Sequence, residues 1–257
     1  MDFTHKAYGQ LLDSFIKSGY RVVTVREYLE GNKDPYTLIL RHDVEWNPKR
    51  ALDIANLEHS RGFHSTLYFR ADTKAFDLEL MLYLQRLGFE IGYHFNTLDR
   101  CNGDFEKAVI LFEEELRKIR DAGIDVKTVC SHGDPRVEKK GYKVNNEIFL
   151  RYPELYSKNN ILGEAYLSIN FPSLTYISDV GIRWNKASST KELMLRFISR
   201  EWPVVYVLTH PDYWSPSFMR AMGLKVAAKG IKAFKVNKTI IWGKKLISLP
   251  RRFLSGN

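Results

Sequence analysis

At residues 36–45 the chain reads Tyr36-Thr37-Leu38-Ile39-Leu40-Arg41-His42-Asp43-Val44-Glu45. The first half is a short aliphatic and β-branched run, which is typical of a buried β-strand. Charged side chains follow directly at the end of that run. Pro48 comes shortly afterwards, and proline is favoured in the first turn of a helix because its missing N–H has no partner there. The segment therefore predicts a buried strand that leads through a polar turn into a helix.

The same strand–helix unit recurs along the chain. Short apolar segments alternate with segments in which apolar side chains recur every three or four residues. Such alternation predicts a parallel sheet with helices outside it. A glycine-rich turn after the first strand is missing, which argues against a dinucleotide-binding fold. We predict strands at 22–25, 36–42, 64–70, 89–94, 126–131, 166–169, 175–178 and 203–209, and helices at 3–18, 48–61, 77–87, 104–122 and 190–200.

Length and composition fit one globular domain. A chain of 257 residues is normal for a single α/β barrel. The hydrophobic fraction of 44% and the charged fraction of 27% exclude a disordered or fibrous protein. We predict one barrel-like α/β domain over residues 1–212. A doubly wound open sheet is the alternative that periodicity leaves open.

Two features bear on the cellular compartment. The chain starts with polar residues instead of an apolar signal segment, and no apolar run approaches the roughly 20 residues that span a bilayer. The two cysteines, Cys101 and Cys130, are expected to be free thiols, because disulfides are rare inside cells. The expected location is cytoplasmic.

The net charge of +9 is concentrated after Asp212, the last acidic residue. Ten lysines and arginines follow it, so residues 1–212 are nearly neutral. Aromatic and aliphatic residues lie between these basic residues. Residues 213–257 are therefore predicted to form a helical, basic, amphipathic extension. It either packs on the barrel with a solvated basic face or makes a peripheral contact with an anionic membrane. Nucleic acid is not expected as a partner, because the body is neutral and shows no recognised module.

Four histidines share one kind of position. His42, His94, His132 and His210 each follow or end a predicted strand, and a carboxylate or amide side chain lies close behind each of them. The strand ends of a barrel converge on one rim, where active sites lie. Imidazole and carboxylate groups are good ligands for zinc or a similar divalent ion, which activates water for hydrolysis. Hydrolysis also needs a base and an acid, for which Asp or Glu and His are suitable.

Five short motifs in a fixed order now resemble the polysaccharide-deacetylase (NodB-type) superfamily, in its His-Asp-Val-Asp variant group. Each motif is short, and the order and spacing make the resemblance specific. The motifs cover about residues 36–212. They are Leu40-Arg41-His42-Asp43-Val44-Glu45-Trp46, Glu90-Ile91-Gly92-Tyr93-His94, Ser131-His132-Gly133 with Pro135, Ile177-Ser178-Asp179-Val180-Gly181 with Trp184, and Leu208-Thr209-His210-Pro211.

The resemblance implies both a fold and an activity. The fold would be a distorted (β/α) barrel, usually with seven strands. The activity would be metal-dependent removal of N- or O-acetyl groups from sugars. By position in the motifs, Asp43 matches the catalytic base, His210 the catalytic acid and His94 a metal-binding histidine.

The chain departs from the family pattern at two points. The usual motif has adjacent aspartates, whereas here the second carboxylate is Glu45, two residues after Asp43 and on the same side of an extended strand. The position four after His94, normally a second histidine, is Leu98. Asn96 and Asp99 lie nearby, and His132 is chemically the better replacement. The predicted metal ligands are therefore Asp43, His94 and His132. The predicted catalytic residues are Asp43, Glu45 and His210, and the division of base and ligand between the two carboxylates stays open.

Further side chains are candidates for substrate binding, each with a structural alternative. Asp179 could orient a catalytic group or bind sugar hydroxyls, or it could simply shape a turn. Trp184 could stack on a sugar ring or pack in the core. Arg41 and Arg136 could clamp an anionic group or fix a carboxylate. His42, beside Asp43, is grouped with these residues as a supporting side chain.

The resulting prediction is a metal-dependent hydrolase, with zinc as the expected ion, that removes an acyl group from a sugar or glycan precursor. Two alternatives remain. One is an inactive, glycan-binding relative with the same fold. The other is a barrel glycoside hydrolase that uses two carboxylates, such as Asp43 with Glu45 or Asp179.

Overall fold

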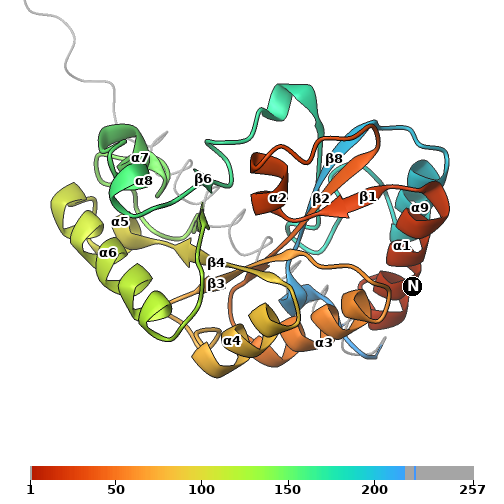
Figure 1. Cartoon of the computed structure of the whole chain (residues 1–257), viewed down its shortest axis with the longest axis horizontal. Coiled ribbons are helices and arrows are strands. Elements are labelled where there is room, and N and C mark those ends of the chain that lie inside the picture. Colours follow the sequence, from red (N-terminus) through yellow and green to blue (C-terminus); the bar gives the residue numbers. More distant parts are fainter. Residues whose placement is uncertain (1, 218–222, 224–257) are drawn as a thin grey trace, which may run out of the picture.

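The sheet at the centre of the computed structural model, which describes residues 2–217 and 223, is entirely parallel (Figure 1). Its strand order is β6-β5-β4-β3-β2-β8-β7, and β1 pairs with the first half of β2 on the same side as β3. The strands are β1 Arg21–Val23, β2 Thr37–Val44, β3 Thr66–Arg70, β4 Glu90–Phe95, β5 Thr128–Ser131, β6 Gly163–Glu164, β7 Thr175–Ser178 and β8 Val204–Thr209.

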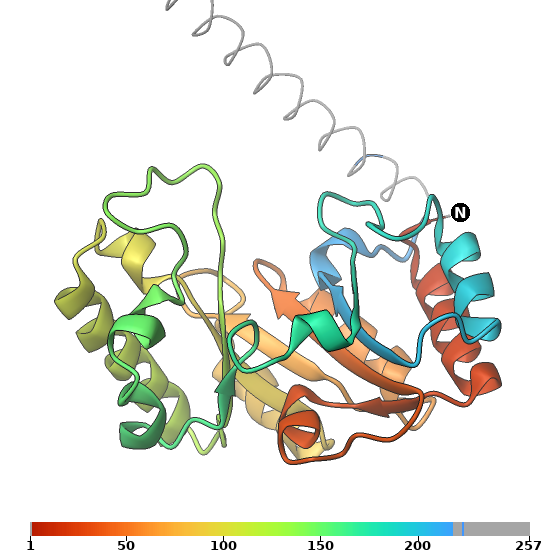
Figure 2. The ribbon, with the colours of Figure 1, turned by 90° about the horizontal axis from the view of Figure 1, so that it is seen from above.

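Most helices run along the outer, convex side of this curled sheet (Figure 2), whereas Val25 and Tyr28 of one short helix pack with the inner core. In the described residues, β6 and β7 end the strand order and no ladder joins them, so the barrel is open. The predicted distorted (β/α) barrel built on seven strands is confirmed. The helices are α1 His5–Ser18, α2 Val25–Leu29, α3 Pro48–His59, α4 Leu78–Arg86, α5 Thr97–Arg100, α6 Phe105–Asp121, α7 Glu147–Arg151, α8 Leu155–Lys158 and α9 Thr190–Ile198, with 3₁₀ turns η1 Phe171–Ser173 and η2 Pro211–Tyr213.

Local sequence accounts for the start and end of these helices. Thr4 caps α1 by accepting the Ala7 N–H, and Gly19 ends it in the left-handed conformation, with φ of 67°. Asn47 caps α3, and Pro48 occupies its first turn as predicted. These signals place α3 directly after β2, so that the residues between them form a short turn at the carboxyl end of the sheet.

Strand β2 is buried on both faces, and its side chains alternate between them. Leu38 and Leu40 belong to the outer core beneath α1 and α9, whereas Ile39 packs inside the barrel with Tyr68 and Tyr206. By the same alternation, Arg41 and Asp43 point into the barrel and His42 points out. The strand therefore delivers its charged residues to two different environments.

The barrel interior is crowded by aromatic rings, and this explains a glycine in β4. A Cβ on Gly92 would lie 2.3 Å from two carbons of the Tyr68 ring. Tyr68 in turn lies beside the Arg41 guanidinium, 5.5 Å from its ring centroid. A glycine at this position lets β3 and β4 approach each other with a tyrosine between them.

The structure differs from the prediction around residues 160–170. The strand predicted at 166–169 is not formed, and β6 lies earlier, at Gly163–Glu164. The buried Glu164 carboxylate accepts the N–H groups of Tyr166 and Leu167, which turns the chain there instead of extending it. The short helices α2, α5, α7 and α8 were also not predicted.

The folded body continues past residue 212, the predicted domain boundary. Trp214 is fully buried in the outer core, and Ser215 forms a β-bridge with Thr4. Most of the predicted basic extension, 213–257, lies outside the described residues. Within residues 2–217, no helix combines the length and apolar character that a membrane span requires.

Candidate active site

Arg41 and Asp43 form a buried ion pair inside the barrel at the end of β2. Arg41 Nη2 lies 2.9 Å from Asp43 Oδ2, and the guanidinium also donates to the hydroxyls of Tyr166 and Tyr206, at 2.7 and 3.0 Å. Burial by itself would raise the pKa of Asp43, but Arg41, then His94 and His210, hold it below its usual value. Asp43 Oδ1 is buried and has no hydrogen-bond partner. The pair thus presents an ionised carboxylate with one open oxygen.

A second group of ligand atoms lies next to Asp43 at the ends of β2, β4 and β5. His94 Nε2 lies 3.7 Å from Asp43 Oδ2, and His132 Nε2 lies 3.3 Å from Glu45 Oε1. The two imidazole rings are 5.2 Å apart, with their planes nearly perpendicular. The ligand atoms of Glu45, His94 and His132 all lie within 4.8 Å of one another. One carboxylate and two imidazoles are a set that binds zinc in hydrolases.

The electrostatics of this group suit a cation. His94 Nδ1 is hydrogen-bonded to the Cys130 carbonyl, whereas its buried Nε2 atom has no partner. Burial lowers the pKa of His94 to about 4, so the ring is neutral at physiological pH and can bind a metal through Nε2. Burial opposes ionisation of Glu45, but the hydrogen bond from His132 and the charge of His210 lower its pKa to about 2.

A second combination, Asp43, His94 and Cys130, also brings three ligand atoms within 4.8 Å. It includes the fully buried Cys130, and burial raises the pKa of this thiol well above its usual value, although the nearby Arg41 charge opposes the shift. The thiol therefore stays protonated, whereas a cysteine binds metal as the thiolate. The outer set of Glu45, His94 and His132 is therefore the better cation site.

His210 and Asp179 form the opposite side of the site. Asp179 Oδ1 lies 2.7 Å from His210 Nδ1, and Asp179 Oδ2 accepts the His210 backbone N–H and the indole N–H of Trp214. The His210 ring stacks on Tyr213 at 4.8 Å. Burial would lower the pKa of His210, but Asp179 outweighs it and raises that pKa to about 9. His210 is therefore protonated at neutral pH.

The structure does not bring all the predicted residues together. His42 points to the outer face of β2, where its ring nitrogens contact Thr209 and Glu58. Trp184 is 6% exposed, packs against Phe3 in the outer core and donates its indole N–H to Thr190. Neither side chain reaches the interior of the barrel, because alternation along β2 and packing beneath α1 turn them away.

The remaining predicted and alternative positions have local partners. Arg136 is largely exposed and pairs with Asp134 through three contacts of 2.6 to 3.1 Å. Leu98 is fully buried in a second hydrophobic cluster, which also contains Phe112 of α6. Asp99 does not reach the ligand group, because it accepts hydrogen bonds from Lys139 and Tyr142 and thereby anchors the loop that follows His132.

Two residues of the site were missed by the sequence analysis. Arg70, the last residue of β3, lies 3.2 Å from His132 Nε2 through Nη1 and binds Asp72 through two contacts of 2.7 and 3.0 Å. Trp46, directly after Glu45, is half exposed, and the Arg70 guanidinium lies 5.6 Å from its ring centroid. The position of Arg70 at a strand end was the one signal that could have found it.

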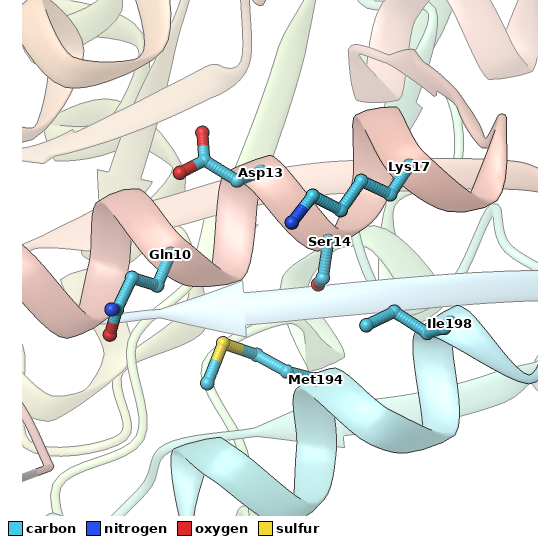
Figure 3. Close-up of a pocket in the computed structure, with 6 residues that line it drawn as sticks. All are labelled: Gln10, Asp13, Ser14, Lys17, Met194 and Ile198. Carbon is cyan, nitrogen blue, oxygen red and sulfur yellow. The ribbon is translucent and has the colours of Figure 1, made fainter.

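A separate depression on the outer surface lies between α1 and α9 (Figure 3). Its volume is about 290 Å³. None of the candidate residues contributes to it. Its lining consists of Gln10, Asp13, Ser14, Lys17, Met194 and Ile198.

No family model and no curated protein matches the chain. Among solved structures it is similar to a CE4 family pseudoenzyme from Bacillus anthracis, with 15% identity, 77% of this chain and 62% of that chain covered, and a TM-score of 0.45. A mutant of that pseudoenzyme with restored enzymatic activity matches at 14% identity, covering 79% and 64%, with a TM-score of 0.45. A family 4 carbohydrate esterase from Streptomyces lividans, in complex with acetate, matches at 13% identity, covering 76% and 88%, with a TM-score of 0.42.

These structural neighbours are members of CE4, the family of NodB-type polysaccharide deacetylases that the sequence motifs resemble. The chain spans less than two thirds of the length of the first two structures. At identities of 13 to 15% and TM-scores of 0.42 to 0.45, these likenesses assign neither a family nor a role to this chain. The chemistry of this chain therefore has to follow from its own residues.

Proposed function

We propose that this protein is a divalent-metal-dependent hydrolase that removes an acyl group from a carbohydrate or a glycan precursor. The observation that carries the proposal is the unpartnered, buried Nε2 atom of His94, which lies among Asp43, Glu45 and His132. A buried polar atom without a partner costs about 1–3 kcal/mol. Such a cost is explained when a ligand completes the site.

The residues fit a zinc-like ion. Glu45, His94 and His132 would hold it, and its chemistry would be to acidify a bound water and polarise the acyl oxygen. Glu45 is ionised and His94 is neutral at physiological pH, as metal ligands must be. This assignment makes Glu45 the ligand and leaves Asp43 for proton transfer.

Asp43 is suited to act as the general base. Its pKa lies below the usual value, so the carboxylate is ionised and can accept a proton. Arg41 fixes Oδ2, and the unpartnered Oδ1 is the atom that would take the proton from the attacking water. The base is therefore oriented by an ion pair before substrate arrives.

His210 is suited to act as the general acid. Its pKa of about 9 keeps the ring protonated at neutral pH. Asp179 engages Nδ1, so the proton that His210 can donate to the leaving amine or alcohol is the one on Nε2. An ionised carboxylate and a protonated imidazole together supply both proton transfers that acyl hydrolysis requires.

The same charge states argue against the glycoside hydrolase alternative. A two-carboxylate glycosidase needs one carboxylic acid that stays protonated near neutral pH. The pKa values of both Asp43 and Glu45 are lowered, not raised. Neither group is therefore in the state that this reaction needs. Asp179, the other carboxylate considered, has both oxygens engaged by His210 and Trp214.

Purified protein treated with chelator and then titrated with Zn²⁺ tests the proposal. We expect one equivalent to bind, and acetate to be released from an N-acetylated tetrasaccharide or from 4-nitrophenyl acetate only in the loaded protein. The matched pair is His94→Ala, which should lose both properties, and His64→Ala on the amino-terminal side of β3, which should keep them. Zinc binding without acetate release from either probe would support the inactive glycan-binding alternative. An absence of zinc binding would overturn the proposal.

A further inference from the structure

His42 is part of the signature motif, yet it belongs to a buried polar cluster on the outer face of the sheet. Its Nε2 atom donates to Glu58 Oε1 at 2.7 Å, and its Nδ1 atom lies 2.6 Å from Thr209 Oγ1. The Glu58 carboxylate also accepts the hydroxyls of Tyr8 and, at 2.6 Å, Ser65. All five side chains are fully buried.

This cluster joins segments that are far apart in the sequence. Tyr8 lies on α1, Glu58 on α3, His42 on β2 and Thr209 on β8. Three donors surround the buried Glu58 carboxylate, so both of its oxygens are hydrogen-bonded. A satisfied buried network of this kind has one arrangement, because moving any member leaves a polar group without a partner.

His42 and Thr209 each lie directly before a proposed catalytic residue. The two residues are register partners at the carboxyl ends of β2 and β8. The next residue along β2 is Asp43, and the next after β8 is His210. Side chains alternate along a strand, so a bond on the outer face sets the direction of the following residues on the inner face.

We infer that His42 is a positioning residue whose bonds to Thr209 and Glu58 hold the ends of β2 and β8 together, so that Asp43 and His210 keep their places on opposite sides of the site. The inference rests on the proposed function for the roles of Asp43 and His210. This clasp, the bonds of His42 to Thr209 and Glu58, is fully buried on the outer face of the sheet. A displacement of about 1 Å between catalytic groups can lower a rate about 100-fold, so a clasp at this position has kinetic consequences.

The kinetic test uses three variants of β8 in the zinc-loaded protein. Thr209→Val keeps the shape but removes the hydroxyl, Thr209→Ser keeps the hydroxyl, and Val207→Ala removes core packing two residues away. We expect kcat to fall about 10- to 100-fold in Thr209→Val with KM little changed, and to be largely retained in Thr209→Ser. Val207→Ala should lower the melting temperature without this loss of kcat. Equal kcat values in Thr209→Val and Val207→Ala would overturn the inference.

A second measurement does not depend on activity. Hydrogen–deuterium exchange should quicken in Thr209→Val at the ends of β2 and β8, residues 41–46 and 207–212, and stay as in the wild type in Thr209→Ser. If Thr209→Val does not fold, His42→Gln replaces it, because glutamine can still donate to Glu58 but does not bridge to Thr209. Unchanged exchange at both strand ends would overturn the inference. If exchange quickens at these strand ends in Thr209→Val while the wild type hydrolyses neither probe, the clasp is upheld and the proposed function is rejected.

Discussion

The Asp179 carboxylate holds His210 from two directions. One oxygen lies 2.7 Å from the ring nitrogen Nδ1, and the other accepts the backbone N–H of the same histidine at 3.0 Å. A fully buried histidine would ordinarily lose its proton, because burial disfavours the charged ring. Asp179 reverses that preference and raises the pKa of His210 to about 9. The conversion of His210 into an acid therefore depends on one neighbouring carboxylate.

Replacing Asp179 by asparagine should move the alkaline limit of activity. In the wild type, protonated His210 is present below pH 9, so kcat/KM should fall as the pH rises through about 9. In Asp179→Asn the pKa of His210 should drop below 9. The alkaline limb of the pH–rate profile should then move to lower pH. The pH–rate profile and the NMR titration of His210 measure this change. Asp125→Asn, an exposed and remote carboxylate, is the control. An unshifted limb in Asp179→Asn would contradict the role given to His210.

The free energy of unfolding should also depend on pH through His210, and the direction of this dependence follows from its raised pKa. The folded pKa of about 9 lies above the ordinary value of 6.5, so the protonated ring stabilises the folded state. This contribution is fully present below pH 6.5 and is lost as the pH rises through about 9. Urea unfolding at pH 6 and pH 10 should show a loss of stability in the wild type that is smaller in Asp179→Asn. Parallel losses in both proteins would show that another group is responsible.

The two combinations of ligand atoms predict different results for zinc affinity. If Glu45, His94 and His132 bind the ion, Glu45→Gln and His132→Ala should each lower its affinity at least 10-fold, whereas Cys130→Ser should have little effect. Competition with a chromogenic chelator measures these affinities. Cobalt substitution adds a spectroscopic check, because a thiolate ligand gives an intense near-ultraviolet charge-transfer band. Such a band, or a strong effect of Cys130→Ser, would place the ion at the inner set instead.

The buried ion pair of Arg41 and Asp43 predicts that losing one partner lowers the free energy of unfolding more than losing both charges. Arg41→Met removes the partner of a buried carboxylate, and breaking such a pair typically costs about 3–5 kcal/mol. The double variant Arg41→Met with Asp43→Asn leaves no uncompensated charge and should recover much of that loss. Urea denaturation measures both free energies of unfolding. Equal stability of the single and double variants would mean that the charge of Asp43 does not depend on Arg41.

The fold and one half of the site follow from short-range features of the sequence. The aliphatic run before Asp43, the proline at position 48 and the spacing of apolar residues predict β2, α3 and the parallel sheet. Strand ends that converge on one rim predict the meeting of Asp43, His94 and His132. Because β2 extends through Val44, alternation along the strand also places His42 on the opposite face of the sheet from Arg41 and Asp43.

The other half depends on contacts between distant segments, which leave no local pattern. Arg70 reaches the site only because Asp72 fixes its guanidinium beside His132. Glu164 turns the chain where β-propensity favours a strand, because three backbone N–H groups converge on its carboxylate. Trp184 is held in the outer core by packing against Phe3. In each case tertiary structure decides between two roles that the residue type alone allows.

Trp46 is the side chain that we expect to contact the sugar. It is 50% exposed, lies next to the proposed ligand Glu45 and has its backbone N–H fixed by Asp212 at 3.0 Å. Loss of one ring face from a sugar contact costs about 1–1.5 kcal/mol, so Trp46→Ala should raise KM for an N-acetylated tetrasaccharide about 5- to 13-fold. The KM for 4-nitrophenyl acetate, which has no sugar ring, should stay unchanged. Tyr83→Ala removes a ring of similar exposure on α4, 49%, and serves as the matched control. An equal KM for the tetrasaccharide in the wild type and Trp46→Ala would show that the sugar binds elsewhere on the rim.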